Sequence, residues 1–520
     1  MTEEYDYTDD VREEGQYVEK SYQFERDMDI EEHDKRFDTL RFGEESNTHF
    51  AYHDMEHLLT TDDGKETLIN MLKTFFDAQK ERLSILDGYS KGENYTILEG
   101  RRRLEQNKSD YRISHNWGGY ISNYITGYLM SEPITIGTSQ PDDDESETLK
   151  TIKEINTDND INTLDFDLGF DASRYGRAFE VHYRSSDKKD KIVLVDAQEI
   201  FIIRSVDVTK EIIGAVHVPV YNGQVHVTIY TDTKIIKYHP FNEGVYTLNE
   251  NESGSKPHFY KMVPVVEWQN NRFRQGDFEP VIPSIDAYDS AQSDTANYMS
   301  DLNDALLVVS GDFASSGLTP KDFAVMLKAN FAMLESGVDH MGKQTSLTAE
   351  YLYKQYDVAG TEAYKDRLLN DIHSLSNVPD LNDDKFNSAQ SGVALQYKML
   401  GLGQIKSIKE SLYSKALKRR YQLIENVHQG LSDKGITAND LTFTFHTNVP
   451  EDVWAEVEKY ISSGGEMSVQ TLMELASFIG DVDEEKRRML VESLGPQATD
   501  EEKEFVLRGG TNGTDEATDL

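Results

Sequence analysis

The spacing of the apolar residues changes twice along this chain, and this change limits the fold class more than any other feature. Over residues 67–86 the apolar side chains recur every three or four positions, the period of a helix that faces a core. Over residues 177–248 they alternate instead, as in half-buried strands. Helical spacing returns at residues 278–302. A run of strands between runs of helices predicts an α+β fold.

Local signals set the expected limits of the elements. Asn222-Gly223, between two short apolar runs, predicts a two-residue hairpin, and Pro219 marks its first strand as an edge strand. A helix over 113–129 should stop before Pro133 and lead into a short strand at 134–136. The other expected elements are a helix at 164–175, a strand at 305–309, a helix at 361–377, a long helix after Gly392 and three helices between 453 and 494.

Composition excludes several classes of function. The chain has 520 residues and no cysteine, so it has neither disulfides nor cysteine nucleophiles nor thiolate metal sites. Its formal charge of −41 argues against a general basic surface for nucleic acid. It contains no apolar run of eighteen residues, and its first thirty residues are acidic, unlike a secretory signal. We therefore expect a folded cytosolic protein without a membrane span.

Five short strings occur in an order that resembles the portal (head-tail connector) proteins of tailed double-stranded DNA bacteriophages, the siphophage type of Gram-positive hosts. No single string is specific, because each is short and built of common residues, but their shared order is much more so. Together they extend over about residues 67–495. They are residues 107–135, residues 174–180, residues 263–271 with Asp277 and 285–290, Pro379-Asp380 with Phe386 and 391–395, and residues 468–472.

The resemblance implies a division of the chain into the parts of a portal subunit. These are an α/β wing at 49–263, strand-rich over 177–248, a first stem helix at 264–302, a clip at 303–356, a second stem helix at 357–377, a tunnel loop at 378–391, a long helix with a return to the wing at 392–452 and an α-helical crown at 453–508. The acidic segment 1–48 is expected to be a flexible arm and 509–520 a disordered tail, and neither matches the family.

The same resemblance implies a structural protein rather than an enzyme, with no cofactor and no metal. Such proteins form rings, usually of twelve subunits, at one capsid vertex, and the ring is the channel for packaging and ejecting double-stranded DNA. The partners implied are the terminase large subunit, the major capsid and scaffolding proteins and a head-completion connector protein. The expected location is the virion, after synthesis in the host bacterial cytoplasm, with a role in nucleating procapsid assembly.

Two groups of residues are the candidate sites. In the clip, Lys321 and Lys328 are expected to contact the motor or the connector. In the tunnel loop, polar side chains would make sequence-blind contacts with the DNA backbone, acidic ones would limit their strength, and Phe386 would either form an apolar collar or pack against a neighbour. The loop residues are Asp383, Asp384, Lys385, Phe386, Asn387, Ser388 and Gln390.

Two other functions remain open from the sequence. His53, Glu56 and His57 fit the H-x-x-E-H pattern of inverted zinc proteases, in which two histidines on one helix face share a metal, but no third ligand can be identified. A general scaffold would explain the helices and the acidity, but not the five ordered strings. A phosphate-binding loop is excluded because the chain has no G-x-x-x-x-G-K-[ST] string.

Overall fold

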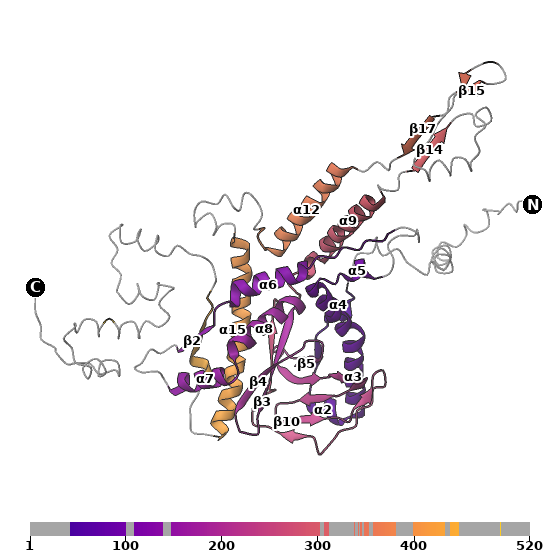
Figure 1. Ribbon diagram of the computed structural model, residues 1–520. Helices are drawn as coiled ribbons and strands as arrows, with labels where there is room; N and C mark the ends of the chain where they lie inside the picture. Colours follow the sequence, from indigo (N-terminus) through magenta and orange to yellow (C-terminus); the bar gives the residue numbers. More distant parts are fainter. Residues whose placement is uncertain are drawn as a thin grey trace, which may run out of the picture. The chain divides into compact units, whose positions relative to one another are not determined.

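The structure is a computed structural model that describes the central part of the chain. Its described residues are 42–99, 109–138, 147–301, 306–310, 337–338, 342, 344–345, 348–352, 357–380, 399–431, 437–446 and 489. The chain divides into two compact units, Met1–Phe386 with Lys398–Asn448, and Asn387–Tyr397 with Val449–Leu520. All the elements described below belong to the first unit (Figure 1).

Two antiparallel sheets of three strands and one mixed sheet of six form the β part of this unit. The sheet β13-β3-β4 consists of Val265–Gln269, Arg177–Arg184 and Asp190–Val195. The sheet β11-β8-β7 consists of Phe241–Asn242, Gln224–Val225 and Val220–Tyr221. The six-stranded sheet runs β1-β5-β6-β9-β10-β12 through Phe50–Tyr52, Ile200–Ser205, Ile212–His217, Thr228–Tyr230, Lys234–Lys237 and Lys256–Pro257, with only β1 and β5 parallel.

The predicted hairpin is confirmed in its turn and in its position at an edge. Asn222 has φ 53° and Gly223 has φ 75°, so both turn residues adopt the left-handed backbone that the two-residue turn demands. The turn joins β7 to β8, and β7 is an outer strand of its sheet. Pro219 directly precedes β7. It lies outside the paired residues, so the sheet loses no hydrogen bond through its missing N–H.

Helices precede and follow the strand-rich region. Those before it are α2 (Met55–Thr60), α3 (Asp62–Thr74), the π-helical turn η4 (Phe75–Gln79), α4 (Lys80–Lys91), α5 (Tyr95–Leu98), α6 (Trp117–Met130), α7 (Glu147–Asp158) and α8 (Ile161–Tyr175). Those after it are η5 (Glu279–Val281), α9 (Ile282–Asp301), α12 (Val358–Ser376) and α15 (Leu400–Leu431). Short 3-10 turns, η3 (Glu44–Asn47) and η6 (Ala438–Asp440), are the other helical elements of the described residues.

Three further strand pairs connect distant or late parts of the sequence. The strand β2 (Thr135–Thr138), which was predicted after Pro133, pairs antiparallel with β18 (Leu441–Thr444), more than 300 residues later. The strands β14 (Leu306–Ser310) and β17 (Thr348–Leu352) pair antiparallel, and so do β15 (Gly337–Val338) and β16 (Gln344–Thr345).

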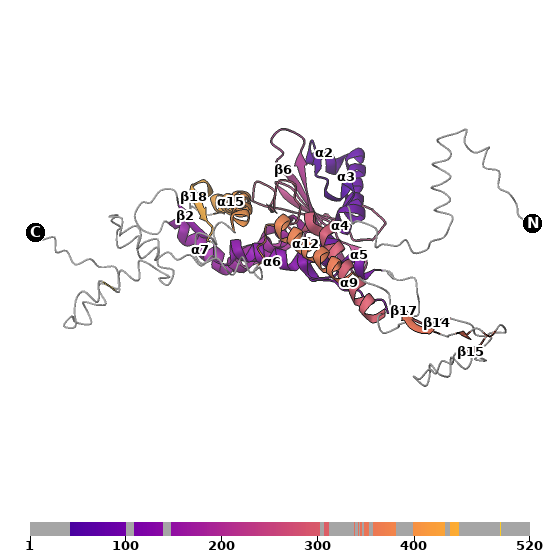
Figure 2. The same cartoon turned by 90° about the horizontal axis from the view of Figure 1, so that it is seen from above.

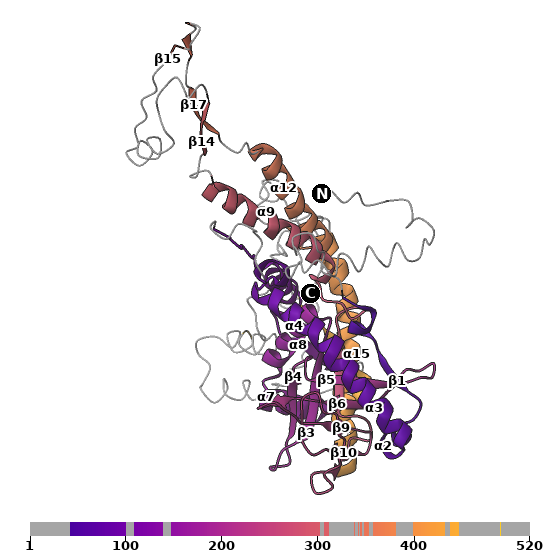
Figure 3. The same cartoon turned by 90° about the vertical axis from the view of Figure 1, so that its right-hand side faces the viewer.

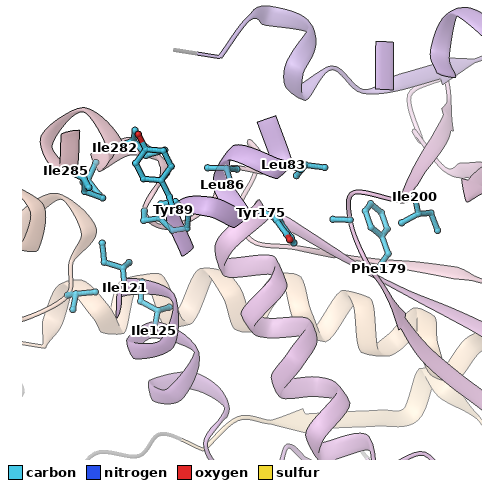
Figure 4. Packing of buried hydrophobic residues seen from close by; sticks show 14 of the residues in the cluster. Leu83, Leu86, Tyr89, Ile121, Ile125, Tyr175, Phe179, Ile200, Ile282 and Ile285 are labelled. Atoms are coloured by element: carbon cyan, nitrogen blue, oxygen red, sulfur yellow. The ribbon is translucent and has the colours of Figure 1, made fainter. Parts of the chain in front are cut away.

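The apolar side chains form three cores. One lies under the six-stranded sheet, where Phe75 and Phe201 pack with ring centroids 5.0 Å apart. A second packs α15 against α8 and β13. The third joins α4, α6 and α9 to β3 and to the ends of α12 and α15, and Figure 4 shows a part of it. Its members include Leu83, Leu86, Ile121, Ile125, Phe179, Ile282, Ile285, Ile372 and Leu402.

A buried ion pair ties α15 to the sheet below it. Arg420 of α15 donates from Nε to Glu180 Oε1 of β3 at 3.0 Å, and both side chains are 0% exposed. Burial opposes the ionisation of Glu180, but the charge of Arg420 and hydrogen bonds from His182 and Arg420 outweigh it, so its pKa falls from 4.5 to about 2. The contribution of this pair is therefore complete above pH 4.5 and is lost as the pH falls towards 2.

Most of the predicted elements that fall within the described residues are present, and the differences have local causes. The three helices expected between 453 and 494 lie outside the described residues. The helix expected over 113–129 begins only at Trp117, because Asn116 accepts a hydrogen bond from Gly119 and caps it there. Helix α7 was not predicted, although its apolar residues Leu149, Ile152 and Ile155 keep helical spacing. The first part of the segment 264–302, which was assigned to the first stem helix, contains the strand β13 of the sheet β13-β3-β4. The boundaries of the arm, wing, clip, crown and tail remain predictions.

Within the described residues, none of the helices combines the length and the apolar character needed to cross a bilayer.

Replacing Arg420 by Met should destabilise the fold by about 3–5 kcal/mol, because Glu180 would keep a buried charge without its main partner. The matched control is Lys418→Met, an exposed position on the same helix, which should change stability by less than about 0.5 kcal/mol. Urea unfolding at pH 7 measures both, and the difference should shrink towards pH 2 as Glu180 becomes protonated. Equal midpoints for the two variants would contradict this role of the pair.

Candidate functional site

Two helices that stand side by side form the most distinctive part of the described chain. Helix α9 leads to β14, and α12 follows β17, the antiparallel partner of β14, so the two helices run in opposite directions. They contact each other and lie side by side in all three views (Figures 1, 2 and 3). At 1.5 Å per residue, the 20 residues of α9 span about 30 Å. The position of α9 therefore decides where the connected strands begin.

Helix α9 buries a stripe of polar side chains in its middle and last turns. Its first turns bury Ile282 and Ile285, as the sequence predicts, but Asp289, Ser293 and Asn297 are no more than 5% exposed. These three residues are four positions apart and so lie on one face of the helix. Buried polar groups need hydrogen-bond partners. The stripe therefore has to be matched by another polar element.

The partner of this stripe is an extended segment, residues 109–116, here called the strap. Its alternate residues meet successive turns of α9: the backbone N–H groups of Tyr111, Ile113 and His115 donate to Asn297 Oδ1, Ser293 Oγ and Asp289 Oδ1 at 2.7, 2.9 and 3.2 Å. Two extended residues advance about 6.6 Å, and four helical residues about 6.0 Å. The two repeats nearly match, so three consecutive turns can be bonded without a break.

The carboxylate of Asp289 is the centre of the polar contacts at the end of the strap. Its Oδ1 lies 2.6 Å from His115 Nδ1, and its Oδ2 accepts a hydrogen bond from Asn94 Nδ2 at 2.8 Å. Asp289 is 0% exposed. Since Asn94 caps α5, this carboxylate joins three elements: α9, α5 and the strap.

A second buried carboxylate, Asp286, joins α9 to α4. The hydroxyl of Tyr89 donates to Asp286 Oδ1 at 2.6 Å. Burial raises the pKa of Asp286 to about 6, although the hydrogen bond from Tyr89 acts in the opposite direction. Asp286 is therefore partly protonated just below neutral pH, and Tyr89 keeps it hydrogen-bonded in either state.

The end of α12 and the start of α15 are held together in the same core. Val378 and Leu402 are each 1% exposed and belong to the core that contains α4, α6 and α9. Asn377 ends α12 with φ 57°, and a Cβ on Gly401 would lie 2.5 Å from Asn377 Oδ1. The close approach of these two residues explains the glycine. The segment that connects α12 to α15 therefore begins and ends at neighbouring points of this core.

An aromatic group joins this point to the helix pair. The ring of Trp117, at the start of α6, lies 5.4 Å from His373 of α12 and 6.1 Å from Tyr288 of α9, edge to face in both cases. His373 Nδ1 is also 3.0 Å from the carbonyl oxygen of Val378. Trp117 therefore contacts both helices, and His373 connects this contact to Val378 at the base of the loop.

All the candidate site residues named from the sequence lie outside the described residues. This holds for the clip lysines Lys321 and Lys328 and for the loop residues Asp383, Asp384, Lys385, Phe386, Asn387, Ser388 and Gln390. The structure describes the flanks of that loop up to Asp380 and from Met399 onward. The roles of these residues stay predictions.

The zinc-protease pattern does not have the geometry that it requires. Helix α2 begins at Met55 and is capped by Asp54, so His53 precedes the helix that carries Glu56 and His57, although the two histidine rings lie 4.9 Å apart. His57 Nδ1 lies 3.1 Å from the hydroxyl of Tyr52. In the part of the chain that the structure describes, no group of three histidine, aspartate or glutamate side chains is placed to hold a metal.

Comparisons with known proteins agree with each other. The family model described as phage portal protein, SPP1 Gp6-like, matches residues 70–495. The portal protein of Bacillus phage SPP1 is 23% identical over 427 residues, which cover 77% of this chain and 79% of that protein.

Two solved structures are also similar. One is a chain of the neck of an empty GTA particle with C6 symmetry, at a TM-score of 0.41 and 10% identity, covering 79% of this chain and 93% of that one. The other is a chain of the neck of a native GTA particle with C12 symmetry, at 0.42 and 9%, covering 70% and 89%.

Replacing Asp289 by Ala should destabilise the protein by at least about 2 kcal/mol, because the backbone and ring N–H groups of His115 and the amide of Asn94 would lose a buried acceptor. Met299→Ala is the matched control, since Met299 lies on the same helix and is 49% exposed, and it should have a much smaller effect. Urea unfolding followed by circular dichroism measures both. If the two variants unfold at the same midpoint, the strap does not hold α9.

Proposed function

The chain belongs to the SPP1 Gp6-like family of phage portal proteins, and from this premise we propose that it forms a ring at one capsid vertex through which double-stranded DNA enters and leaves. The resemblance noted in the sequence is confirmed, including its siphophage type. The portal family is a structural one, and the proposed role of this chain is mechanical. Its location is accordingly the portal vertex of the virion, after synthesis in the host bacterial cytoplasm.

The observation that supports the proposal is the way in which the helix pair and the ends of the loop that follows it are anchored. Helix α9 is bonded to the strap over three turns, and α12 contacts α9. The ends of the loop, at Val378 and Leu402, are fixed in the same core. In a ring, every subunit would present its loop at the same height on a rigid support. Twelve subunits, the number we propose, would surround the duplex with twelve loops.

Charge supports a channel in which DNA slides without adhering. Twelve chains of formal charge −41 would carry about −490 charges, and like charge repels a polyanion from the surrounding surface. Within the tunnel loop, Lys385, Asn387, Ser388 and Gln390 would touch phosphates without reading the sequence. Asp383 and Asp384 would keep these contacts weak, and Phe386 would either pack or form a collar.

The proposed partners follow from the same role. The clip strands β14 and β17 would present a surface to the terminase large subunit during packaging and to a head-completion connector protein afterwards. The major capsid and scaffolding proteins would meet the ring during procapsid assembly, which the ring would nucleate. Neither DNA passage nor assembly needs a cofactor.

Negative-stain electron microscopy of the purified full chain tests ring formation directly. The proposal predicts closed rings with a central hole wide enough for a duplex of about 20 Å, whose major groove alone is about 12 Å wide. The protein should form them alone or with capsid and scaffolding proteins present. Single copies that never close into a ring under either condition would contradict it, and they would favour a general scaffold.

Shortening the loop within residues 382–390 should leave ring assembly intact but reduce DNA packaging or retention. Assembly should survive because the flanking residues Val378 and Leu402 stay in their core. The control replaces the same nine positions by a Gly/Ser linker of equal length, which separates the length of the loop from its side chains. Packaging at the normal level in the shortened ring would remove the loop from the mechanism.

Charge reversal at Lys321 or Lys328 should slow the association of the ring with the motor or the connector, because exposed charges guide encounter and register. We expect a decrease of about tenfold or less in the association rate at low salt, which salt should diminish. Lys234→Glu, an exposed change on β10 of the body, is the control. Unaltered association rates with both partners would place the two lysines outside the interface.

A further inference from the structure

Arginine side chains gather inside the body of this strongly acidic protein, in a group that the proposed function does not use. Arg82, Arg177 and Arg274 are buried at 1, 5 and 8% exposure, and Arg204 and Arg419 are half-buried beside them. They come from α4, β3, the loop after β13, β5 and α15. A chain of net charge −41 thus has a positive interior here.

The nearby carboxylates neutralise only part of this charge. Glu267 pairs with Arg274, whose Nε lies 2.5 Å from Oε1, and also with Arg204. Glu279 pairs with Arg82 at 2.6 Å. Within the described residues, the buried Glu267 and the largely buried Glu279 pair with this group, so five arginines share two carboxylates and an excess of three positive charges is left. Glu211, which also acts on Arg419, is exposed.

Arg177 is the member that most lacks a partner. Its Nη2 donates to Gln79 Oε1 at 3.0 Å, and Gln79 is held in that orientation because its own Nε2 donates to the carbonyl oxygen of Thr48 at 2.8 Å. Among the described residues, Nε of Arg177 and Nε of Arg204 have no acceptor. Burial lowers the pKa of Arg177 to about 10, and the charge of Arg82 adds to that effect.

A small cavity lies at these two arginines. Arg177 and Glu267 line it from the three-stranded sheet, Phe201, Ile202 and Arg204 from β5, and His49 and Phe50 from β1 and the residue before it. The cavity volume is about 10 Å³, which is about the space of one water molecule. His49 adds no charge at neutral pH, because burial and the neighbouring Arg274 lower its pKa to about 4.

We propose that this cavity binds one chloride ion, held by Arg177 and Arg204. An uncharged water could accept the free N–H groups but would leave the excess charge in place, and an unpaired buried charge is strongly unfavourable. Phosphate and sulfate are too large for a space of this size. Glu267 does not repel the ion decisively, because Arg204 and Arg274 already neutralise it. The ion joins the six-stranded sheet to the sheet β13-β3-β4.

This inference is independent of the ring. It concerns the stability of the subunit body, so it stands whether or not the assembly proposal holds.

Thermal unfolding of the full chain in sodium chloride and in sodium gluconate, at constant ionic strength, tests the site. The midpoint should rise by roughly 1–3 °C for each tenfold increase in chloride above the dissociation constant. Arg177→Met should abolish this dependence. Arg272→Met, which removes an exposed arginine, should retain it. A wild-type midpoint that does not respond to chloride, or an Arg177→Met variant that responds as the wild type does, would overturn the proposal.

Anomalous diffraction from wild-type crystals grown in sodium bromide tests the position of the ion without any variant, in case Arg177→Met does not fold. A bromide peak between Arg177 and Arg204 is the expected result. Density for a water molecule, or for a carboxylate of residues 1–41, at that position in the presence of bromide would refute chloride binding.

Discussion

The requirement that buried polar groups be paired determines the arrangement around α9. Asp289, Ser293 and Asn297 are buried on one face of this helix, and their hydrogen-bond capacity is met by the backbone of the strap. An apolar stripe could slide along its partner with little loss of stability. This polar stripe makes its hydrogen bonds in only one register. Helix α12, the connected strands and the base of the loop all take their places from α9 or from the core beneath it.

Charged groups inside the body reinforce that arrangement. Arg420 holds α15 on β3 through Glu180, and Lys409 of α15 pairs with Asp277, which directly precedes the turn into α9, at 2.8 Å. Helix α15 is thus tied both to the sheet β13-β3-β4 and to the segment that leads into α9. Four arginines, Arg82, Arg177, Arg274 and Arg420, are buried within this acidic chain.

The sequence predicted what depends on local chemistry. The turn at Asn222-Gly223, the long helices and the strand after Pro133 all follow from backbone preference and apolar spacing, and the family itself was recognisable from five short strings. The strap was not predicted, because an extended segment bonded to helix side chains has no periodic apolar signal. The polar stripe of α9 did keep a four-residue spacing, and that spacing was the available sign. The loop and clip residues lie outside the described part of the chain, so their roles rest on the family resemblance.

Amide hydrogen exchange in the strap is the most direct test of the claim that α9 is held by its polar face. The account predicts an alternating pattern: the amides of Tyr111, Ile113 and His115 should be slowed by about a hundredfold or more relative to an unstructured chain. Those of Arg112 and Ser114 donate to no side chain of α9 among the described residues, and they should exchange faster. Uniform exchange at the unstructured rate from residue 109 to 116 would contradict the account.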